Sequence, residues 1–564
     1  MDFKKMEYKR PNIELAQETF QGFIGKIENA NSLEEASEAL KDINTLRNEI
    51  DSMCAIVTIR NTIDTTDKFY EDEQAYLDEK LPIYEGIISN CYKAMIGCKY
   101  KEGLKVIFKP QLFNIANLAV KTISPEVIDD MQVQNKLVTE YTKLIASAKI
   151  DFEGEERNLP GMGPFTQSKD REVRKKATTA TSNFYVENED KFDEIFDGLV
   201  KSRTAMARKL GYENFIQLGY DKLNRTDYTP EMVANFRRQV KENIVPLYKE
   251  LRKRQSKRLG IENMKFYDEN LEFLTGNATP KGDSQWIIDQ AKKMYSELSP
   301  ETNEFFNFMI DNNLMDLINK KGKAGGGYCH FIGKYKTPFI FSNFNGTSGD
   351  VDVLTHEAGH AFQAYSSRAY DVPEYSFPTY EASEIHSMSM EFITWPWMEL
   401  LFGEDADKYK FSHLSSAILF IPYGVAIDEF QHFAYGNPDA TPTERKSEWR
   451  RIEKEYLPCK DYDGVDIYER GAFWFKQSHI FQTPFYYIDY TLAQICALQF
   501  WIKSNENREA SWEDYLALCK KGGSESFLEL VDVAKLNSPF EDGCISKVIT
   551  EVQAWLDKVD DTKL

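Results

Sequence analysis

Apolar residues recur at intervals of three and four along most of this chain, the spacing that places them on one face of an α-helix. Residues 11–145 are rich in charge and mostly free of glycine and proline, which is typical of an antiparallel helical lobe. The helical pattern is clearest at 33–65, 70–96, about 286–320, 400–460 and 544–558. The periodicity therefore predicts a mainly α-helical protein.

Two stretches interrupt this helical pattern. Residues 147–168 alternate apolar and polar positions and then gather glycine and proline, which indicates a short hairpin or turn. The run Gly325-Gly326-Gly327 permits positive φ angles, and β-prone residues follow at 331–332 and 338–343. The run lacks the Gly-Lys-Ser/Thr ending of a phosphate-binding loop. We therefore expect a small hairpin or sheet just before residue 349.

Composition narrows the class of protein and its partners. The chain has 564 residues, of which 28% are charged and 42% apolar, as in soluble globular proteins. Its formal net charge of −21 argues against binding to a phosphate backbone or to an anionic membrane surface. The eight cysteines form no C-x-x-C pair, and no secretory signal or uninterrupted membrane-length apolar run is visible. We expect a cytoplasmic protein with free buried thiols and no nucleic-acid or membrane partner.

The candidate chemistry lies in His356-Glu357-Ala358-Gly359-His360, an H-E-x-x-H pattern. Residues four apart share one face of a helix, so His356 and His360 can direct their imidazoles at one metal ion. Glu357 would then lie beside the ion, where its carboxylate can hold and deprotonate a metal-bound water. Apolar residues at helical spacing around the motif indicate a buried helix, in which a metal would serve all three polar side chains.

A catalytic zinc site needs a third protein ligand, and a predicted helix at 380–391 offers several. Glu384 and Glu391 are seven residues apart and share one helical face, whereas His386 points elsewhere. Glu381 lies three residues before Glu384 and could share that face. Spacing alone therefore prefers Glu384 and leaves Glu381 open.

These motifs resemble one known family. His356–His360, followed by Glu384-Ile385-His386-Ser387 and then Glu391, is similar to the thimet-oligopeptidase-like zinc peptidases, closest to the oligoendopeptidase F branch with its Pz-peptidase-like members. Upstream segments that resemble the same family lie at 171–177, 193–212 and 224–228. The resemblance thus covers most of the chain, from about Phe152 to Trp555.

The resemblance implies a ligand set and an architecture. Glu384, which opens an E-x-x-S turn, would be the third zinc ligand, with one Zn²⁺ per chain. Gln363 departs from many members, which carry histidine there, but that position is not a ligand in the family. We place Glu391 behind the ligands, where it would orient them. The implied fold has two helical lobes around a deep substrate channel, with a small β-sheet next to the zinc-binding helix.

We divide the chain into three regions on this basis. Residues 1–150 would form the N-terminal helical lobe, 151–320 would continue the lobe and the channel wall, and 321–564 would be the catalytic region. The expected function is that of a zinc-dependent endopeptidase that hydrolyses internal bonds of short unfolded oligopeptides.

A second constellation lies in the aromatic segment 471–490. Without the metal motif it would be a buried aromatic strip, whereas beside a zinc site it supplies donors for the oxyanion of peptide hydrolysis. The resemblance assigns this role to His479, Tyr486 and Tyr490. Tyr487 competes with Tyr486, because the spacing differs between branches of the family.

Further residues are assigned to substrate binding or to structure. Gly326, Gly327, Tyr328, His330 and Tyr487 are our expected substrate contacts, because an edge strand beside the metal can pair with an extended peptide. Four histidines lie outside the H-E-x-x-H pattern and the aromatic segment, and as histidines we expect them to have a structural role: His330, His386, His413 and His432.

Two alternatives stay open at this point. A zinc exopeptidase, either a carboxypeptidase or a dipeptidase, could use the same channel with a charged group that holds a peptide terminus. A non-catalytic peptide-binding protein with a relic motif is the other alternative. The sequence leaves side-chain preference and the choice between monomer and homodimer undetermined.

Overall fold

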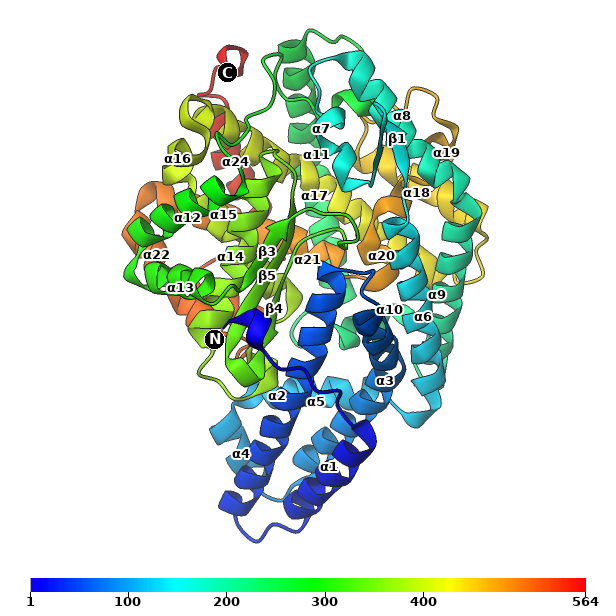
Figure 1. Ribbon diagram of the computed structural model, residues 1–564, viewed down its shortest axis with the longest axis vertical. Helices are drawn as coiled ribbons and strands as arrows, with labels where there is room; N and C mark the ends of the chain where they lie inside the picture. Colours follow the sequence, from blue (N-terminus) through cyan, green and yellow to red (C-terminus); the bar gives the residue numbers. More distant parts are fainter. Residues whose placement is uncertain (1) are drawn as a thin grey trace.

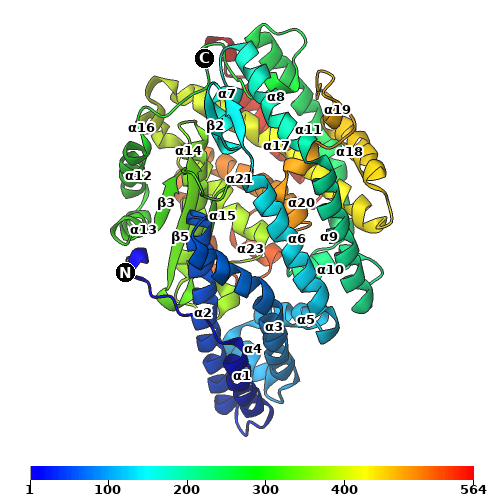
Figure 2. The same cartoon turned by 45° about the vertical axis from the view of Figure 1, so that its right-hand side comes forward.

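The computed structural model describes residues 2–564 as a predominantly helical fold with two small sheets (Figure 1). The mainly α-helical prediction is confirmed. The first helices form a projection at one end of the molecule, drawn in blue at the bottom of Figures 1 and 2. They are α1 (Ile13–Glu28), α2 (Leu33–Ile63), α3 (Lys68–Gly97), α4 (Lys101–Phe108) and α5 (Pro110–Thr122).

This projection has a hydrophobic core separate from that of the main body. Its helices contribute the apolar stripes that the sequence pattern predicts, and α2 and α3 end within three residues of the predicted limits. Val372 and Tyr375 join the same core from far along the chain. The Tyr375 hydroxyl accepts from the Leu112 N–H, so this later segment is packed against the first helices.

The main body contains the remaining helices around one large core. Those that precede the metal motif are α6 (Ile128–Ala146), α7 (Gly163–Thr166), α8 (Arg171–Glu187), α9 (Glu189–Lys209), α10 (Phe215–Lys222), α11 (Pro230–Leu259), α12 (Ser284–Leu298) and α13 (Pro300–Asp311). The later ones are α14 (Gly349–Ser367), α15 (Tyr380–Ile393), α16 (Met398–Phe402), α17 (Ala406–Gly436), α18 (Pro442–Tyr456), α19 (Asp466–Glu469), α20 (Ser478–Gln482), α21 (Tyr487–Glu506), α22 (Arg508–Lys521), α23 (Phe527–Val533) and α24 (Cys544–Leu556).

Both predicted β elements are present. Strands β1 (Ile150–Phe152) and β2 (Glu155–Arg157) form an antiparallel hairpin. A three-stranded sheet has the order β3-β5-β4, with β3 (Met315–Ile318) parallel and β4 (Tyr328–Ile332) antiparallel to β5 (Thr337–Phe344). Strand β4 therefore lies at an edge of the sheet that precedes α14.

The prediction that helix α13 continues to about residue 320 is wrong for its last turns. Helix α13 ends at Asp311, and Asn313 adopts a positive φ of 50°. Asparagine tolerates this left-handed conformation, which turns the chain out of the helix. Met315 then pairs with Ile340 of β5, so this apolar segment forms a strand because of its backbone hydrogen bonds with β5.

Helix α2 is fastened to strand β4 and its flanking loops. The hydroxyls of Thr62 and Tyr328 lie 2.6 Å apart, and the Thr62 carbonyl accepts from the Ala324 N–H at 2.8 Å. At the other end of β4, the Lys334 N–H donates to Ser52 Oγ at 2.8 Å. The projecting helices thus support the strand that leads toward the metal motif.

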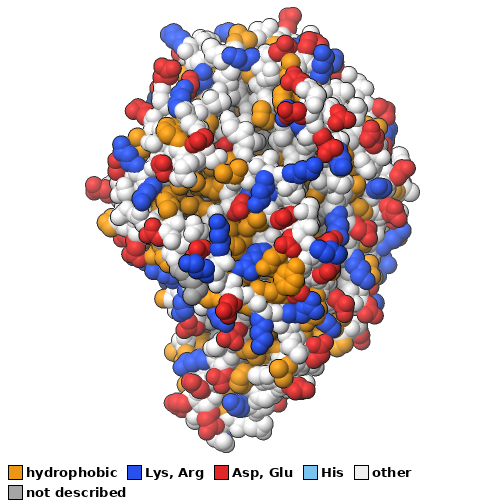
Figure 3. Space-filling model, viewed as in Figure 1, with side chains coloured by type: hydrophobic (Ala, Val, Ile, Leu, Met, Phe, Trp, Pro, Cys, Tyr) orange, Lys and Arg blue, Asp and Glu red, His pale blue; other side chains and the backbone are white. Residues whose placement is uncertain are grey.

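Much of the described surface carries charged side chains, and the longest apolar stretch lies largely inside the fold. Acidic and basic side chains are interspersed over the face seen in Figure 3. One window within residues 373–436 is apolar and long enough to cross a membrane by length and composition alone. Of that window, 67% is buried inside the fold, as expected for a core helix.

Helices α14 and α15 pass each other at the level of their backbones. A Cβ added at Gly359 would lie 2.6 Å from the His386 carbonyl oxygen and 2.7 Å from Ser387 Cα. Real Cβ contacts are longer, so any larger residue at 359 would separate the helices. The Tyr515 hydroxyl donates to the same carbonyl at 2.8 Å and holds α15 from the opposite side.

We expect Gly359→Ala to destabilise the protein by about 1–3 kcal/mol, because the added methyl group overpacks a backbone contact that cannot yield. Gly25→Ala is a matched control, since Gly25 also lies inside a helix but has open space around its Cβ position. That control should be stabilising by up to about 1 kcal/mol. Denaturant unfolding followed by circular dichroism measures both, and equal losses in the two variants would contradict the described helix contact.

Candidate metal centre

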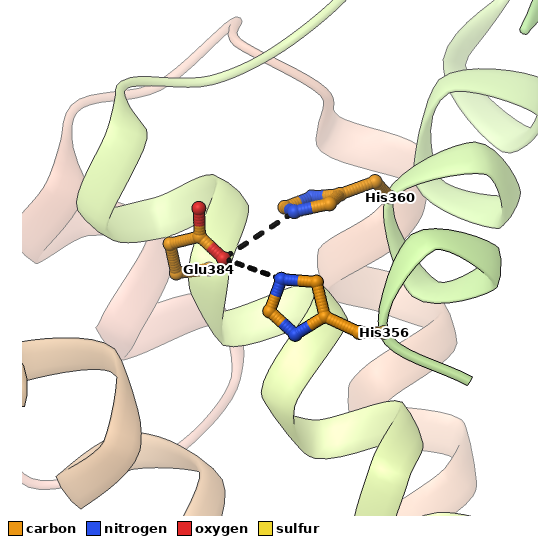
Figure 4. Close-up of side chains that lie close together, drawn as sticks. All are labelled: His356, His360 and Glu384. Atoms are coloured by element: carbon orange, nitrogen blue, oxygen red, sulfur yellow. Dashed lines mark ion pairs between the residues drawn. The ribbon is translucent and has the colours of Figure 1, made fainter. Parts of the chain in front are cut away.

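Helices α14 and α15 bring three ligand-type side chains to one point, as Figure 4 shows. His356 and His360 extend from α14, with their Nε2 atoms 3.2 and 3.3 Å from Glu384 Oε2 on α15. The candidate ligand atoms of all three residues lie within 4.8 Å of one another. Two imidazoles four residues apart and one carboxylate from a neighbouring helix thus converge as the spacing predicts.

Two members of this cluster, Glu384 and His356, are held by further hydrogen bonds. Ser387 Oγ donates to Glu384 Oε2 at 2.8 Å, and the Tyr486 hydroxyl donates to Glu384 Oε1. His356 Nδ1 lies 2.7 Å from Glu391 Oε1, which leaves Nε2 directed at the cluster. Burial alone would raise the pKa of Glu384, but the two histidines lower it well below its ordinary value. The carboxylate is therefore available as an anionic ligand.

Glu357 lies beside the cluster with its carboxylate unsatisfied. The residue is only 5% exposed, and its Oε2 has no hydrogen-bond partner within residues 2–564. Burial raises the pKa of Glu357, while the two histidines oppose that rise. Gly327 packs close to its Oε1, since a Cβ at 327 would lie 3.3 Å from that atom. Burying a carboxylate oxygen without a hydrogen-bond partner is energetically costly, and a proton, a water molecule or a cation beside it would remove that cost.

Glu381, the ligand that spacing left open, is directed away from the histidines. Its Oε1 accepts from Thr379 Oγ1 at 2.7 Å, and the nearest cation is Arg225. Arg225 is fully buried and donates to Asp489 Oδ1 at 2.6 Å, and its charge also acts on Glu381. Burial raises the pKa of Glu381 to about 7. The structure brings Glu384, not Glu381, to the two histidines.

A chain of hydrogen bonds leads to Glu384 from the aromatic segment. Gln477 Nε2 lies 2.8 Å from His479 Nδ1, and His479 Nε2 lies 3.3 Å from the Tyr490 hydroxyl. Tyr490 in turn donates to the Tyr486 hydroxyl at 3.0 Å. The amide nitrogen of Gln477 can only donate, so His479 Nδ1 accepts and its Nε2–H faces Tyr490.

The electrostatics of His479 agree with this neutral tautomer. Burial lowers the pKa of His479 to about 4, although the charge of Glu384 acts in the opposite direction. Tyr423 donates to Gln477 Oε1 at 3.2 Å, which fixes the amide with its nitrogen toward His479. Gln477 is not among the predicted site residues, although it lies only two residues before His479 in the chain.

A cavity of about 570 Å³ opens onto the cluster. Gly327, Tyr328, His479, Tyr486 and Tyr490 line it together with the candidate ligands and Glu357. Three other expected substrate contacts, Gly326, His330 and Tyr487, are not among the lining residues. Tyr487 instead packs its ring against His479, with 4.9 Å between the ring centroids.

The remaining histidines lie outside the cluster. His386 is fully buried on α15, and burial lowers its pKa to about 3. His432 lies 3.5 Å from Asp428 on α17. His413 differs from both, because its Nε2 lies 2.7 Å from Glu391 Oε2, the second oxygen of the carboxylate that holds His356. No spacing in the sequence relates His413 to the motif, so its connection to the cluster was missed.

The residues present fit a catalytic metal ion. Two histidines and one carboxylate are the protein ligands of many zinc sites that leave a fourth position for water. The unpartnered Glu357 oxygen is where a proton acceptor for that water would be needed. Glu391 on His356 supplies the carboxylate–histidine arrangement that orients metal ligands.

Comparison with known proteins gives consistent matches over most of the chain. The model described as Peptidase family M3 matches residues 165–282 and 283–548, and Peptidase M3 N-terminal domain matches 3–123. An oligoendopeptidase F homolog of Borreliella burgdorferi is 25% identical over 65% of this chain and 62% of its own length. Oligopeptidase PepF of Bacillus subtilis is 23% identical over 70% of this chain and 59% of its own length. The chain thus matches about three-fifths of the length of these curated relatives.

A solved structure is far closer in sequence. It is titled Pz peptidase A with an inhibitor, is 58% identical, and has a TM-score of 0.99 with 100% of both chains covered.

We expect Glu384→Ala to lose the metal and Glu381→Ala to keep it, because only Glu384 faces the two histidines. Metal content after dialysis, measured by inductively coupled plasma mass spectrometry, gives the comparison. Glu381→Ala is the matched control on the same helix. Metal retained by Glu384→Ala and lost from Glu381→Ala would contradict the described ligand set.

Proposed function

The chain belongs to peptidase family M3, and from this premise we propose that it is a zinc-dependent endopeptidase that cleaves internal bonds of short unfolded peptides. His356, His360 and Glu384 would hold one Zn²⁺ per chain. We further propose a cytoplasmic location, with peptides rather than nucleic acid or membrane as partners, and either a monomer or a homodimer as the working state.

The observation that carries this proposal is the buried, unpartnered Oε2 of Glu357 beside three convergent ligand side chains. A purely structural metal site would be closed by a fourth protein ligand. Here the fourth neighbour is a carboxylate one residue after His356, and burial raises its pKa toward the range of a useful proton acceptor. This combination supports hydrolysis rather than structural metal binding.

The metal, when bound, would act as a Lewis acid that acidifies water and polarises a carbonyl. Glu357 would accept the proton of the attacking water at Oε2 and then deliver it to the leaving amine nitrogen. Ser387 and Glu391 would keep Glu384 and His356 in place during this exchange. The Tyr486 hydroxyl would hold the other oxygen of Glu384.

The oxyanion that develops on the scissile carbonyl needs preorganised donors. Tyr490 is best suited, because its hydroxyl lines the cavity and donates only to another hydroxyl, whereas Tyr486 donates to Glu384. The Nε2–H of His479 stands behind Tyr490 and would supply a hydrogen bond to its oxygen. We therefore assign oxyanion stabilisation to Tyr490 supported by His479, and ligand positioning to Tyr486.

The edge strand β4 would bind the substrate backbone. Tyr328 and Cys329 of β4 line the cavity, and its other edge is paired with β5. An extended peptide could add to the free edge by main-chain hydrogen bonds. The cavity of about 570 Å³ accommodates an unfolded segment and not a folded domain.

One observation favours the exopeptidase as the second candidate. Lys222, at the end of α10, is the only lysine or arginine that lines the cavity in the described part of the chain. A cation in this place could hold the terminal carboxylate of a peptide. An obligatory carboxypeptidase would then require a free C-terminus, which an endopeptidase does not.

Peptides blocked at both ends distinguish these two activities. We expect the wild-type enzyme to cleave them internally, with fragments identified by mass spectrometry. Glu357→Gln should retain stoichiometric zinc while kcat/KM falls by about 10²- to 10⁴-fold, the usual contribution of a general base. Cleavage confined to peptides with a free C-terminus would favour the exopeptidase, and near-normal hydrolysis by Glu357→Gln would remove the assigned base.

Substitution of the two tyrosines should separate their roles. Tyr490→Phe should lower kcat by about 10²- to 10³-fold with little change in KM, as for the loss of one oxyanion donor. Tyr486→Phe should also weaken zinc binding, because it removes the donor to Glu384 Oε1. Steady-state kinetics and chelator competition measure the two effects. An effect of Tyr490→Phe on KM alone would move Tyr490 to substrate binding.

A further inference from the structure

A second chain of hydrogen bonds runs from the candidate metal ligand His356 to the buried side chain of Trp395. His356 Nδ1 lies 2.7 Å from Glu391 Oε1, and the other carboxylate oxygen lies 2.7 Å from His413 Nε2. The indole Nε1 of Trp395 donates to His413 Nδ1 at 3.2 Å. Four side chains from α14, α15, α17 and the turn after α15 are thus connected in sequence.

Trp395, the last residue of this chain, determines which atom donates and which accepts in each of its hydrogen bonds. An indole N–H can donate but cannot accept, so His413 Nδ1 carries no proton. The proton of neutral His413 is then on Nε2, which donates to Glu391. The carboxylate accepts from both sides, so His356 presents its proton at Nδ1 and an unprotonated Nε2 at the cluster.

The geometry around His413 favours this single arrangement. Trp395 is 7% exposed and His413 9% exposed, and Phe392 and Tyr409 contact the imidazole with ring centroids 4.8 and 5.6 Å away. The surrounding side chains leave little room for another orientation of the ring.

Two carboxyl groups face His413, Glu391 on α15 and Asp352 on α14. Burial alone would lower the pKa of His413, while the bond to Glu391 and the charges of both carboxyl groups raise it. The Tyr409 hydroxyl donates to Asp352 at 2.6 Å, and burial raises the pKa of Asp352 to about 6. The Trp395 N–H opposes a second proton on His413, because that proton would point directly at it.

We propose that Trp395 and His413 are positioning residues that fix the tautomer and orientation of His356 through Glu391, and thereby the affinity of the site for its metal. The inference rests on the metal site of the proposed function and adds two residues to it. Neither residue belongs to the candidate ligand cluster or lines the cavity beside it. Trp395 lines a different cavity of about 630 Å³ together with Trp501, Trp512 and Trp555.

The neighbouring Trp397 provides a matched control. Its indole N–H donates to Glu297 at 2.8 Å and takes no part in the chain to His356. Trp395→Phe and Trp397→Phe each remove one indole N–H and keep an aromatic ring. Zinc dissociation constants from chelator competition, and the visible absorption spectrum of the cobalt-substituted protein, report on the site without reference to activity.

Replacing the residue that hydrogen-bonds a metal-bound histidine typically weakens metal binding by about 10- to 100-fold. Trp395 is two hydrogen bonds beyond Glu391, which occupies that place here. We therefore expect Trp395→Phe to weaken zinc binding roughly 3- to 10-fold. The cobalt spectrum should change with it, and Trp397→Phe should leave both unchanged. Coincident zinc affinities and cobalt spectra in the two variants would overturn the inference.

Substitution of His413 tests the same chain independently of Trp395. His413→Gln can keep a donor to Glu391 and an acceptor for Trp395, whereas His413→Leu removes both. We expect His413→Leu to lose at least about tenfold in zinc affinity and His413→Gln to recover part of that loss. Equal affinity in wild type and His413→Leu would also overturn the inference.

Zinc binding and peptide cleavage by the wild-type protein show whether the inference alone or the proposed function as well has failed. If it binds no metal, the proposed function fails and the inference fails with it. If it binds zinc and cleaves peptides while the Trp395 and His413 variants match it in zinc affinity, only the inference fails.

Discussion

The site depends on the close backbone contact between α14 and α15 at Gly359. The histidines are on one helix and Glu384 is on the other, so the separation of the two helices sets the distance between the imidazoles and the carboxylate. Because position 359 has no Cβ, the His386 carbonyl and Ser387 Cα can approach to distances that another residue would forbid. Gly359, the third residue after His356, therefore allows the close approach of the two helices that carry the cluster.

Two hydrogen-bond chains then hold the cluster from opposite sides. One reaches Glu384 from Gln477 through His479, Tyr490 and Tyr486. The other reaches His356 from Trp395 through His413 and Glu391. In each chain, a group that can only donate determines the tautomer of the histidine that follows it. Buried networks of this kind are costly when incomplete and rigid when satisfied, which suits a site that needs fixed geometry.

The pattern of the sequence was sufficient for most of the helices and for the candidate ligands that the structure brings together. Long amphipathic repeats predicted α2 and α3, and helical spacing placed His356 and His360 on one face and preferred Glu384 over Glu381. These properties depend on residues close together in the chain. Strand β3 was mistaken for helix because its pairing with β5 involves residues far along the sequence. Trp395 and His413 were missed because their hydrogen bonds depend on the packing of α15 against α17, which no spacing in the sequence shows.

The fastening of α2 to β4 has a consequence for dividing the molecule into parts. The second family match begins at residue 165, which suggests a fragment that lacks the first helices. Such a fragment would leave the Tyr328 hydroxyl and the Ala324 N–H without their Thr62 partners. It would also uncover apolar side chains of the main core that Met53, Ile56 and Ile59 of α2 cover in the intact chain, and exposed apolar surface promotes aggregation. The N-terminal helices are therefore part of the packing of the main body, and we expect a chain without them to aggregate rather than to form a smaller stable protein.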